Sequence, residues 1–256
     1  MHQFSRRARW SLIALTPLMA ALAVAPATAS VIISTGKTTN MRCVANVCSP
    51  TAANAVLGAR KLQKLLASAN VTVKSGSGAL DIVVAAPLTW TSGVTLTLDA
   101  FRILSVSRPI SVTGTGGLTI LTNDGGTGGV FLIGGPGHVT FASLSSPLTI
   151  NGHSYILANS IQSLSGAIGG GGGAYVALAS SYDAKPDGVY SSSPINMLFG
   201  GALDALGNTI RNLKIAVKGN RAGFFEAISD GSVQHLNLSN ISVRGGGDAG
   251  IGGLAS

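Results

Sequence analysis

The acidic side chains are the groups in this sequence that could serve as general acids, general bases or metal ligands. They are Asp81, Asp99, Asp124, Asp183, Asp187, Asp204, Asp230, Asp248 and Glu226. A glycoside hydrolase needs two carboxyl groups about 5 to 9.5 Å apart, and a calcium-dependent lyase needs acidic ligands and a cationic base. Among the aspartates, only Asp183 and Asp187 fall within five positions of each other, around a Lys185-Pro186 turn. We therefore expect no catalytic residues unless stacking of distant segments assembles a carboxylate pair.

The histidines, serines and glycine runs show no catalytic or ligand-binding pattern. His138, His153 and His235 have no Cys, His or carboxylate at a metal-ligand spacing, which favours turn or surface positions. No Gly-x-Ser-x-Gly nucleophile elbow occurs with a suitable order of His and Asp. The glycine runs at 125–129 and 169–173 lack the Gly-Lys-Ser/Thr ending of a phosphate-binding loop, so they indicate flexible loops or corners. The sequence thus predicts neither a cofactor nor a metal ion.

Cys43 and Cys48 are the only cysteines in the chain. With four residues between them, they are predicted to close a small disulfide loop in an oxidising compartment, contributing about 2 kcal/mol to stability. A redox or zinc function needs a Cys-x-x-Cys spacing or further ligands, which this sequence lacks. The disulfide is therefore expected to be structural.

Residues 1–29 are predicted to be an export signal. Three arginines fall within residues 6–9, an apolar run follows over 10–24, and a small-x-small pattern places the cleavage site between Ala29 and Ser30. The apolar run is about 15 residues long, against about 20 for a transmembrane helix, and no later segment is longer. We expect export through the inner membrane and no transmembrane segment in the mature chain.

Charge is concentrated near the N-terminus. Of the net charge of +8, residues 1–80 carry nine basic and no acidic groups, whereas residues 81–256 carry eight basic and nine acidic groups. A nucleic-acid-binding domain needs a basic surface on its folded body, so no nucleic-acid partner is expected. Only 10% of residues are charged and 46% are hydrophobic, which excludes intrinsic disorder because enough apolar surface is available to bury.

Residues 49–69 are predicted to form an amphipathic helix, with Ser49 as N-cap, Pro50 at the first helical position and Asn70 as the stop. Its apolar residues follow the i, i+3, i+4 spacing, and its basic residues fall on the opposite, solvated face. Together with the disulfide loop, this helix predicts an N-terminal cap over residues 30–70.

Short β-strands are predicted after Asn70, because runs of three to five apolar, often β-branched residues alternate with turn residues. The runs are 71–73, 82–84, 94–98, 103–106, 110–112, 118–121, 130–133, 139–141 and 148–150. Such spacing suits a sandwich, a barrel or a solenoid.

Internal repetition favours the solenoid. Residues 210–215 align with 233–238 at an offset of 23, and residues 222–225 align with 249–252 at an offset of 27. These offsets match one solenoid coil, and at about 4.8 Å per coil residues 71–256 would form about eight coils in a rod of roughly 40 Å. Glycine, with 33 of its 35 copies after residue 75, is expected to supply positive φ at the corners. Scarce charge suits a structure in which equivalent positions stack.

Several segments resemble filamentous haemagglutinin-like exported adhesins of Gram-negative bacteria. They are residues 78–90, 94–100, 110–114, 150–157 and 175–179. Residues 200–213 resemble the opening of the glycine-rich GLUG-type repeats of these proteins, and residues 222–225 and 251–255 resemble the repeat cores. The resemblance implies an all-β chain folded as a right-handed single-stranded parallel β-helix, a solenoid with a short N-terminal α-helical and disulfide cap.

The resemblance also implies a non-enzymatic surface adhesin, at the cell surface or secreted, with the periplasm crossed in transit. Its partners would be the export machinery, an outer-membrane translocator, and a protein or glycan on a host-cell, bacterial or matrix surface. The expected organisation is a signal peptide (1–29), a cap (30–70) and a β-helix (71–256) with GLUG-like repeats from about residue 198.

Two departures from this family pattern stand out. The chain has no Asn-Pro-Asn-Gly-Ile type secretion motif, and it ends at Ser256 inside a repeat core, as expected for the N-terminal part of a longer protein. Two alternatives stay open. One is a carbohydrate-active β-helix enzyme, either a polysaccharide lyase or a hydrolase, and the other is a truncated fragment without autonomous function.

Overall fold

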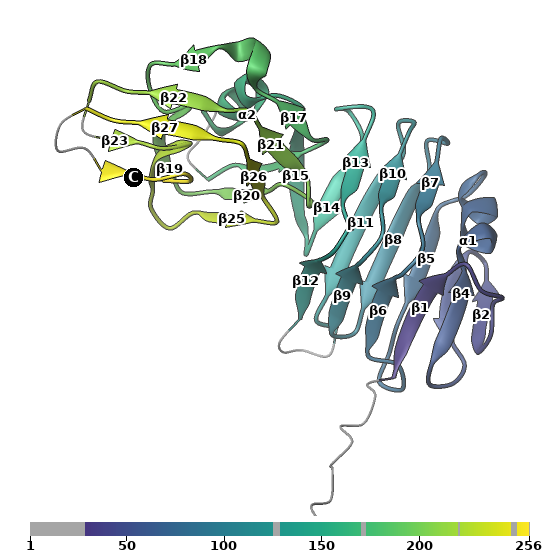
Figure 1. Cartoon of the computed structure of the whole chain (residues 1–256). Helices are drawn as coiled ribbons and strands as arrows, with labels where there is room; N and C mark the ends of the chain where they lie inside the picture. The colour runs from purple at the N-terminus through teal and green to yellow at the C-terminus, as the bar shows by residue number, and fades with distance from the viewer. Residues whose placement is uncertain (1–28, 125–128, 170–172, 220, 247–249, 256) are drawn as a thin grey trace, which may run out of the picture.

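The computed structural model describes residues 29–124, 129–169, 173–219, 221–246 and 250–255 (Figure 1). These residues form 28 β-strands, two α-helices and one short 3-10 helix, and most strand pairs are parallel. The prediction of an all-β chain with parallel strand pairing is confirmed. Its closure into a single-stranded β-helix stays a prediction.

Three parallel sheets build the N-terminal lobe (residues 29–152). The first sheet contains, in spatial order, β4 (Ala55–Gly58), β1 (Ser30–Ser34), β6 (Asp81–Val84), β9 (Ile103–Val106) and β12 (Val130–Ile133). The second contains β7 (Leu88–Trp90), β10 (Ile110–Val112) and β13 (Val139–Phe141). The third begins with the hairpin of β2 (Met41–Val44) and β3 (Val47–Pro50) and continues through β5 (Val71–Lys74), β8 (Thr95–Ala100), β11 (Gly117–Thr122) and β14 (Leu148–Ile150).

Successive turns of the chain stack in register in this lobe. Ile82 pairs with Leu104, Leu88 with Ile110 and Leu96 with Leu118, so all three sheets advance by 22 residues at this step. At the next step they advance by 27, 29 and 30 residues. Alternate residues of each strand point inward and form one apolar core, because side chains alternate between the two faces of a strand. All nine strands predicted between residues 71 and 150 are present, whereas β7 was not predicted.

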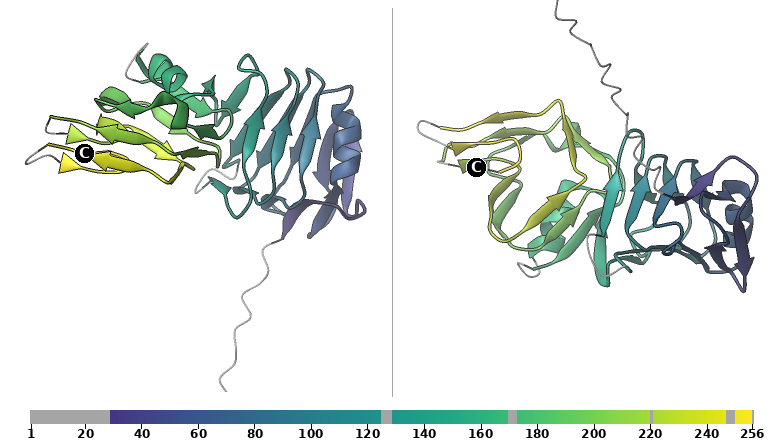
Figure 2. Two further views of the ribbon diagram at one scale, coloured as in Figure 1. Left: turned by 45° about the horizontal axis from the view of Figure 1, so that its top comes forward. Right: turned by 90° about the horizontal axis from the view of Figure 1, so that it is seen from below.

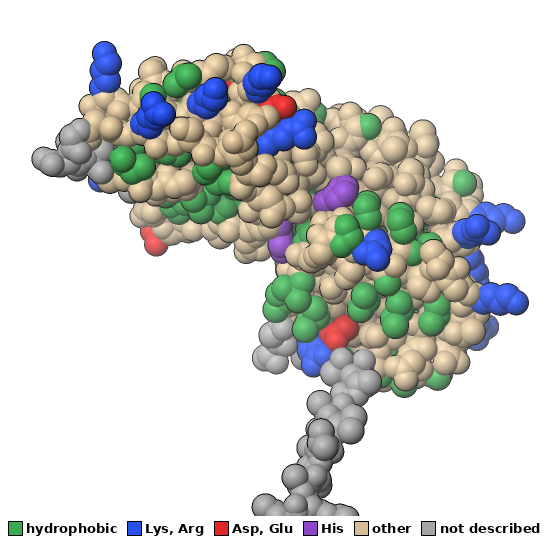
Figure 3. Space-filling view, in the orientation of Figure 1, with side chains coloured by type: hydrophobic (Ala, Val, Ile, Leu, Met, Phe, Trp, Pro, Cys, Tyr) green, Lys and Arg blue, Asp and Glu red, His purple; other side chains and the backbone are tan. Residues whose placement is uncertain are grey.

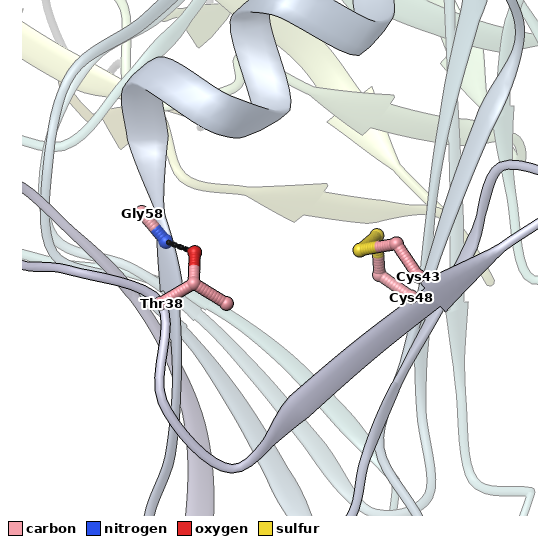
Figure 4. Close-up of a disulfide and its surroundings, with 4 residues drawn as sticks. All are labelled: Thr38, Cys43, Cys48 and Gly58. Atoms are coloured by element: carbon pink, nitrogen blue, oxygen red, sulfur yellow. Dashed lines mark hydrogen bonds between the residues drawn. A yellow bond between two sulfur atoms is a disulfide. The ribbon is translucent and has the colours of Figure 1, made fainter.

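The helix prediction for residues 49–69 is wrong over its first half. The helix α1 spans only Ala59–Leu66, and Gly58 is its N-cap residue. Ser49 and Pro50 belong to β3 instead, and β4 pairs with β1 in the first sheet. Strand pairing therefore outweighs the local Ser-Pro helix signal. The Gly58 N–H donates to the Thr38 hydroxyl at 3.0 Å, which fixes the point where β4 becomes α1 (Figure 4).

The predicted disulfide between Cys43 and Cys48 is confirmed. The two cysteines lie directly opposite each other on β2 and β3, and Ala45 and Asn46 form the turn between them with positive φ values of 47° and 64° (Figure 4). The hairpin and α1 both lie at the outer end of the N-terminal lobe (Figure 1).

Parallel pairing continues in the C-terminal lobe (residues 153–255). Its first layer contains β15 (His153–Ala158), α2 (Ile161–Gly169), β16 (Tyr175–Leu178), β17 (Tyr182–Asp183), the 3-10 helix η1 (Lys185–Asp187), β18 (Val189–Tyr190) and β19 (Ile195–Phe199). The next contains β20 (Ala202–Asp204), β21 (Thr209–Arg211), β22 (Lys214–Ala216), β23 (Arg221–Ala222) and β24 (Phe225–Ile228). The last contains β25 (Ser232–Gln234), β26 (Asn237–Ser239), β27 (Ser242–Arg244) and β28 (Gly250–Ile251).

The predicted repeat offsets of 23 and 27 are wrong. Ile210 pairs with Leu238, an offset of 28, and Ala222 pairs with Ile251, an offset of 29. The same apolar alternation occurs in several strands of one repeat, so more than one alignment of the sequence with itself fits it. The corner residues select the observed register, because Asn212 and Asn240 both have positive φ and the Asn240 amide donates to the Asn212 side-chain oxygen.

Among the described residues, seven asparagines and four glycines have positive φ, so asparagine supplies more of the left-handed corners than glycine. Many glycines instead lie where two backbones come close. Gly207 does both, because its φ is +77° and an added Cβ would lie 2.8 Å from the Gly137 carbonyl oxygen. The expectation that glycines act mainly through positive φ is therefore corrected.

The succession of parallel strands expected after residue 71 is interrupted once. β14 and β15 pair antiparallel through a two-residue turn, in which Asn151 and Gly152 have φ values of 49° and 83°. The strands of the two lobes consequently run in different directions (Figures 1 and 2), and each lobe has its own core. A single uninterrupted rod of eight coils is therefore not formed.

One sheet of the C-terminal lobe separates the two cores. Leu157 and Ala177, on β15 and β16, belong to the core of the N-terminal lobe, whereas Ala158 and Val176 belong to the core of the C-terminal lobe. This sheet therefore covers the end of the N-terminal stack with one face and begins the second core with the other.

Asn208 joins the two lobes at this contact. Its side chain is 1% exposed, and its amide nitrogen donates to the carbonyls of Val139 and Leu178, both at 2.9 Å. Val139 begins β13, whose free edge also donates N–H groups to the carbonyls of Leu206 and Ala179. The edge of the N-terminal lobe is thus satisfied by backbone and side-chain groups of the C-terminal lobe.

We predict that Asn208→Ala lowers the free energy of unfolding by about 2 kcal/mol or more, because it leaves two buried carbonyl groups without a donor. Urea unfolding followed by circular dichroism measures the loss. The matched control is Asn237→Ala, since Asn237 makes one such bond to a carbonyl from an exposed position, so its loss should stay below about 1 kcal/mol. Equal losses in the two variants would contradict this role of Asn208.

Candidate functional site

The predicted signal and its cleavage site fall at the edge of what the structure describes. Residues 1–28 of the predicted leader lie outside the described residues. Ala29 and Ser30, on either side of the predicted cleavage site, are described. Ser30 begins β1, and the Ala29 carbonyl accepts a hydrogen bond from the Leu80 N–H at 2.9 Å. The cleavage site stays a prediction.

Pairing of strands that are distant in the sequence assigns most carboxylates to structural contacts. Arg102 binds Asp81 with two nitrogen atoms, at 2.9 and 2.7 Å. Asp183 accepts from Arg211, from Asn212 and from the Lys185 N–H, and these donors lower its pKa below the usual range. These acids fix corners and adjacent coils together, as expected for charge-assisted hydrogen bonds.

One carboxylate pair is nevertheless assembled from distant coils, as the sequence left open. Asp99 lies on β8 opposite Lys74 of β5, and its carboxylate is 2.5 Å from the Lys74 ammonium. Asp124, just after β11, lies beside Asp99. Its interaction with the Asp99 carboxylate, followed by burial, raises the pKa of Asp124. Asp99 is buried, so the pair is a candidate proton donor and acceptor.

His235 also acquires a carboxylate partner, contrary to the expectation of a plain turn or surface histidine. Its Nδ1 lies 3.0 Å from a carboxylate oxygen of Asp204, which is 4% exposed. Its ring packs edge-on against Phe131 of the N-terminal lobe at 4.9 Å. Asp204 and His235 lie 31 positions apart in the sequence, so only the register of the paired strands brings them together.

A cleft lies beside this pair, where the two lobes meet. We call it the junction cleft and define it by Asn151, His153, Tyr155, Tyr175, Asp204 and Gln234. Its volume is about 450 Å³, within the range of small-ligand sites. Histidine side chains lie along the boundary between the lobes, whereas Lys and Arg gather over β18, β22 and β27 on the C-terminal lobe (Figure 3).

Strand register orders the side chains of the junction cleft. β15 and β16 pair so that Tyr155 lies beside Tyr175, and their rings meet edge to face at 5.4 Å. His153 stacks on Tyr175 at 4.2 Å with an interplanar angle of 10°. Burial, followed by the Asp204 charge, raises the pKa of Tyr155 to about 12, so the phenol stays neutral at physiological pH. The three rings thus form a fixed aromatic surface.

A second polar cluster lies around η1 in the C-terminal lobe. Tyr182 and Tyr190 each donate a hydrogen bond of 2.6 Å to one oxygen of Asp187. The hydrogen bond to Asp187 is the main cause that raises the pKa of Tyr182 to about 12, whereas burial is the main cause for Tyr190, whose pKa is also raised. The predicted turn at Lys185-Pro186 is confirmed as part of η1. The cluster holds this loop against the lobe.

Sequence reasoning missed the junction cleft because its residues come from four strands and a turn. Asn151-Gly152 was the available local signal, since Asn-Gly between two apolar runs is typical of a tight hairpin. Among the described residues, no group of three or more His, Cys, Asp or Glu side chains could hold a metal ion. Within the same residues, no helix has the length and apolar character needed to span a membrane.

We predict that Asp187→Ala returns the pKa of Tyr182 toward the ordinary value of about 10, as measured by ultraviolet absorbance titration of the phenols. In the parent protein the raised pKa means that these hydrogen bonds stabilise the fold below about pH 10. That contribution is lost as the pH rises through about 12. Asp230→Ala, in an exposed position, is the control and should leave the Tyr182 titration unchanged. An unchanged titration in Asp187→Ala would argue against the cluster.

Comparisons with known protein families, with curated proteins and with solved structures find no match to this chain.

Proposed function

We propose that the chain is an exported, non-enzymatic adhesin whose two lobes are short right-handed parallel β-helices. Parallel pairing in all three sheets supports the β-helical assignment in the N-terminal lobe, with the same offset of 22 residues from β6 to β9, from β7 to β10 and from β8 to β11. Parallel pairing of each strand with its counterpart one coil later supports it in the C-terminal lobe. The predicted signal peptide and the disulfide are consistent with export to an oxidising compartment.

A ladder of threonines is the observation that carries the adhesion proposal. Thr72, Thr97, Thr119 and Thr149 occupy successive register positions on β5, β8, β11 and β14, and all four are partly exposed. Thr149 pairs with Ser154, so the ladder continues onto β15, the strand that carries His153 and Tyr155 of the junction cleft on its opposite face. An array of hydroxyl groups at the strand spacing of about 4.8 Å can contact an extended ligand at several points at once. The ligand would be a protein or glycan on a host-cell, bacterial or matrix surface.

We predict that beads carrying the exported chain adhere saturably to at least one such surface and that soluble chain competes with them. The double variant Thr97→Val and Thr119→Val, which keeps shape but removes two hydroxyls, should lower adhesion at least about threefold, corresponding to about 0.7 kcal/mol. The matched control is Thr89→Val with Thr140→Val, on a ladder of the second sheet that does not lead to the cleft. Absence of saturable adhesion would refute the function, and equal losses would refute the ladder.

Polysaccharide cleavage is a second candidate function, favoured by one observation. Asp99 and Asp124 lie together beside Lys74, and the raised pKa of Asp124 suits a general acid. An enzyme of this class would release reducing ends as a hydrolase, or unsaturated ends that absorb ultraviolet light as a lyase.

For this candidate, Asp124→Asn should reduce cleavage of a responsive polysaccharide by about a hundredfold or more. Asp187→Asn, whose carboxylate binds two tyrosines elsewhere, should leave the rate unchanged and serves as the control. No cleavage by the parent protein across a panel of neutral and acidic polysaccharides would eliminate this candidate.

A further inference from the structure

We propose that the junction cleft binds a neutral sugar ring, packed against the aromatic group formed by His153, Tyr155 and Tyr175. The inference rests on the proposed function, because it names the ligand class through which the adhesin would hold a glycan-bearing surface. Three features of the cleft carry it, namely a fixed aromatic surface, a polar rim and the sign of its charge.

The aromatic surface is held in place from two sides. His153 stacks on Tyr175 at 4.2 Å, and Tyr155 contacts the same ring edge to face at 5.4 Å. Tyr155 and Tyr175 are anchored on paired strands, and both are only partly exposed. A sugar ring has a face made of C–H groups, which packs well on the electron-rich face of an aromatic ring. Such a fixed surface binds without the entropic cost of ordering its side chains.

Polar side chains extend the cleft along the same face of the sheet. Tyr175 is followed in register by Ala202 and then Ser232, and the neighbouring row carries Asp204 and Gln234. Ala202 leaves room between the aromatic ring and the polar groups, because its side chain is a single methyl group. Sugar hydroxyls donate and accept hydrogen bonds, as do the hydroxyl of Ser232 and the amide of Gln234. The rim therefore matches the edge of a sugar ring.

The charge of the cleft selects among sugars. Asp204 and Asp230 line it, and no Lys or Arg is among the described residues that form its wall. A uronic acid, sialic acid or sulfated sugar would bring a further negative charge beside these carboxylates, which is unfavourable. A neutral hexose meets no such penalty, so neutral glycans are the expected class.

An organic cation is the main competing ligand, because carboxylates and aromatic rings also bind quaternary ammonium groups. Cation recognition requires several ring faces to surround one space. Here the rings of His153, Tyr155 and Tyr175 pack against one another, so they form one continuous group and do not surround a space between them. This arrangement is not a cage, which favours the sugar.

The test uses the full exported chain with its disulfide intact. A glycan array of neutral and acidic oligosaccharides identifies a bound glycan, and calorimetry then measures its dissociation constant. Tyr175→Ala should weaken binding at least about tenfold, whereas Tyr175→Phe keeps the ring and should stay within about threefold. Gln234→Ala should weaken binding about threefold to tenfold. Tyr182→Ala removes a partly exposed tyrosine outside the cleft and should leave the affinity unchanged.

Four results would overturn the inference: no bound glycan on the array, a preference for acidic glycans, unchanged affinity in Tyr175→Ala, or displacement of the glycan by choline. Thermal unfolding of each variant separates loss of the site from loss of the fold.

The outcome of the sugar-binding test is distinguishable from that of the adhesion test. If cells bind the chain but Tyr175→Ala adheres equally well, only the sugar site fails. If the purified chain binds a neutral glycan through Tyr175 but adheres to no surface, only the adhesin function fails.

Discussion

The open end of a stack of parallel strands is the constraint on which this structure depends. The third sheet of the N-terminal lobe continues from β14 into β15, whereas the first and second sheets end at β12 and β13, where no further strand pairs with them. A strand at such an edge presents N–H and C=O groups that need partners, and the apolar core between the sheets needs a cover at the same level. Here the edge of β13 donates to the Leu206 and Ala179 carbonyls, and its Val139 carbonyl accepts from Asn208. The C-terminal lobe therefore completes the N-terminal lobe and is packed on it through backbone and core contacts.

This arrangement explains the composition of the sheet between the lobes. A sheet that is buried on both faces must carry apolar residues at consecutive positions. β15 and β16 satisfy this with Leu157 and Ala177 on one face and Ala158 and Val176 on the other. The side chain of alanine is short, so both cores pack close to this sheet. One sheet therefore covers the end of the first core and forms one wall of the second.

Local patterns were sufficient to predict the strands but not how they pair. Apolar alternation located nine strands between residues 71 and 150, because each strand must bury alternate side chains. The helix was overpredicted at Ser49 and Pro50, where the pairing of β3 with its neighbours prevails over capping preference. The register of the C-terminal lobe follows the paired corners at Asn212 and Asn240, which apolar alternation alone does not reveal. The candidate site depends on this register, so the sequence could not indicate it directly.

The junction cleft follows from the same register. Tyr175, Ala202 and Ser232 stay in one row although the coil from Tyr175 to Ala202 is shorter than the coil from Ala202 to Ser232. The loops absorb the difference in length, while strand pairing fixes where each side chain lies. A site built in this way tolerates changes in loop length but not a shift of one strand by a single residue, which would turn every side chain of that strand to the opposite face. The strand pairing that covers the end of the N-terminal lobe therefore also fixes the positions of the aromatic surface and its polar rim.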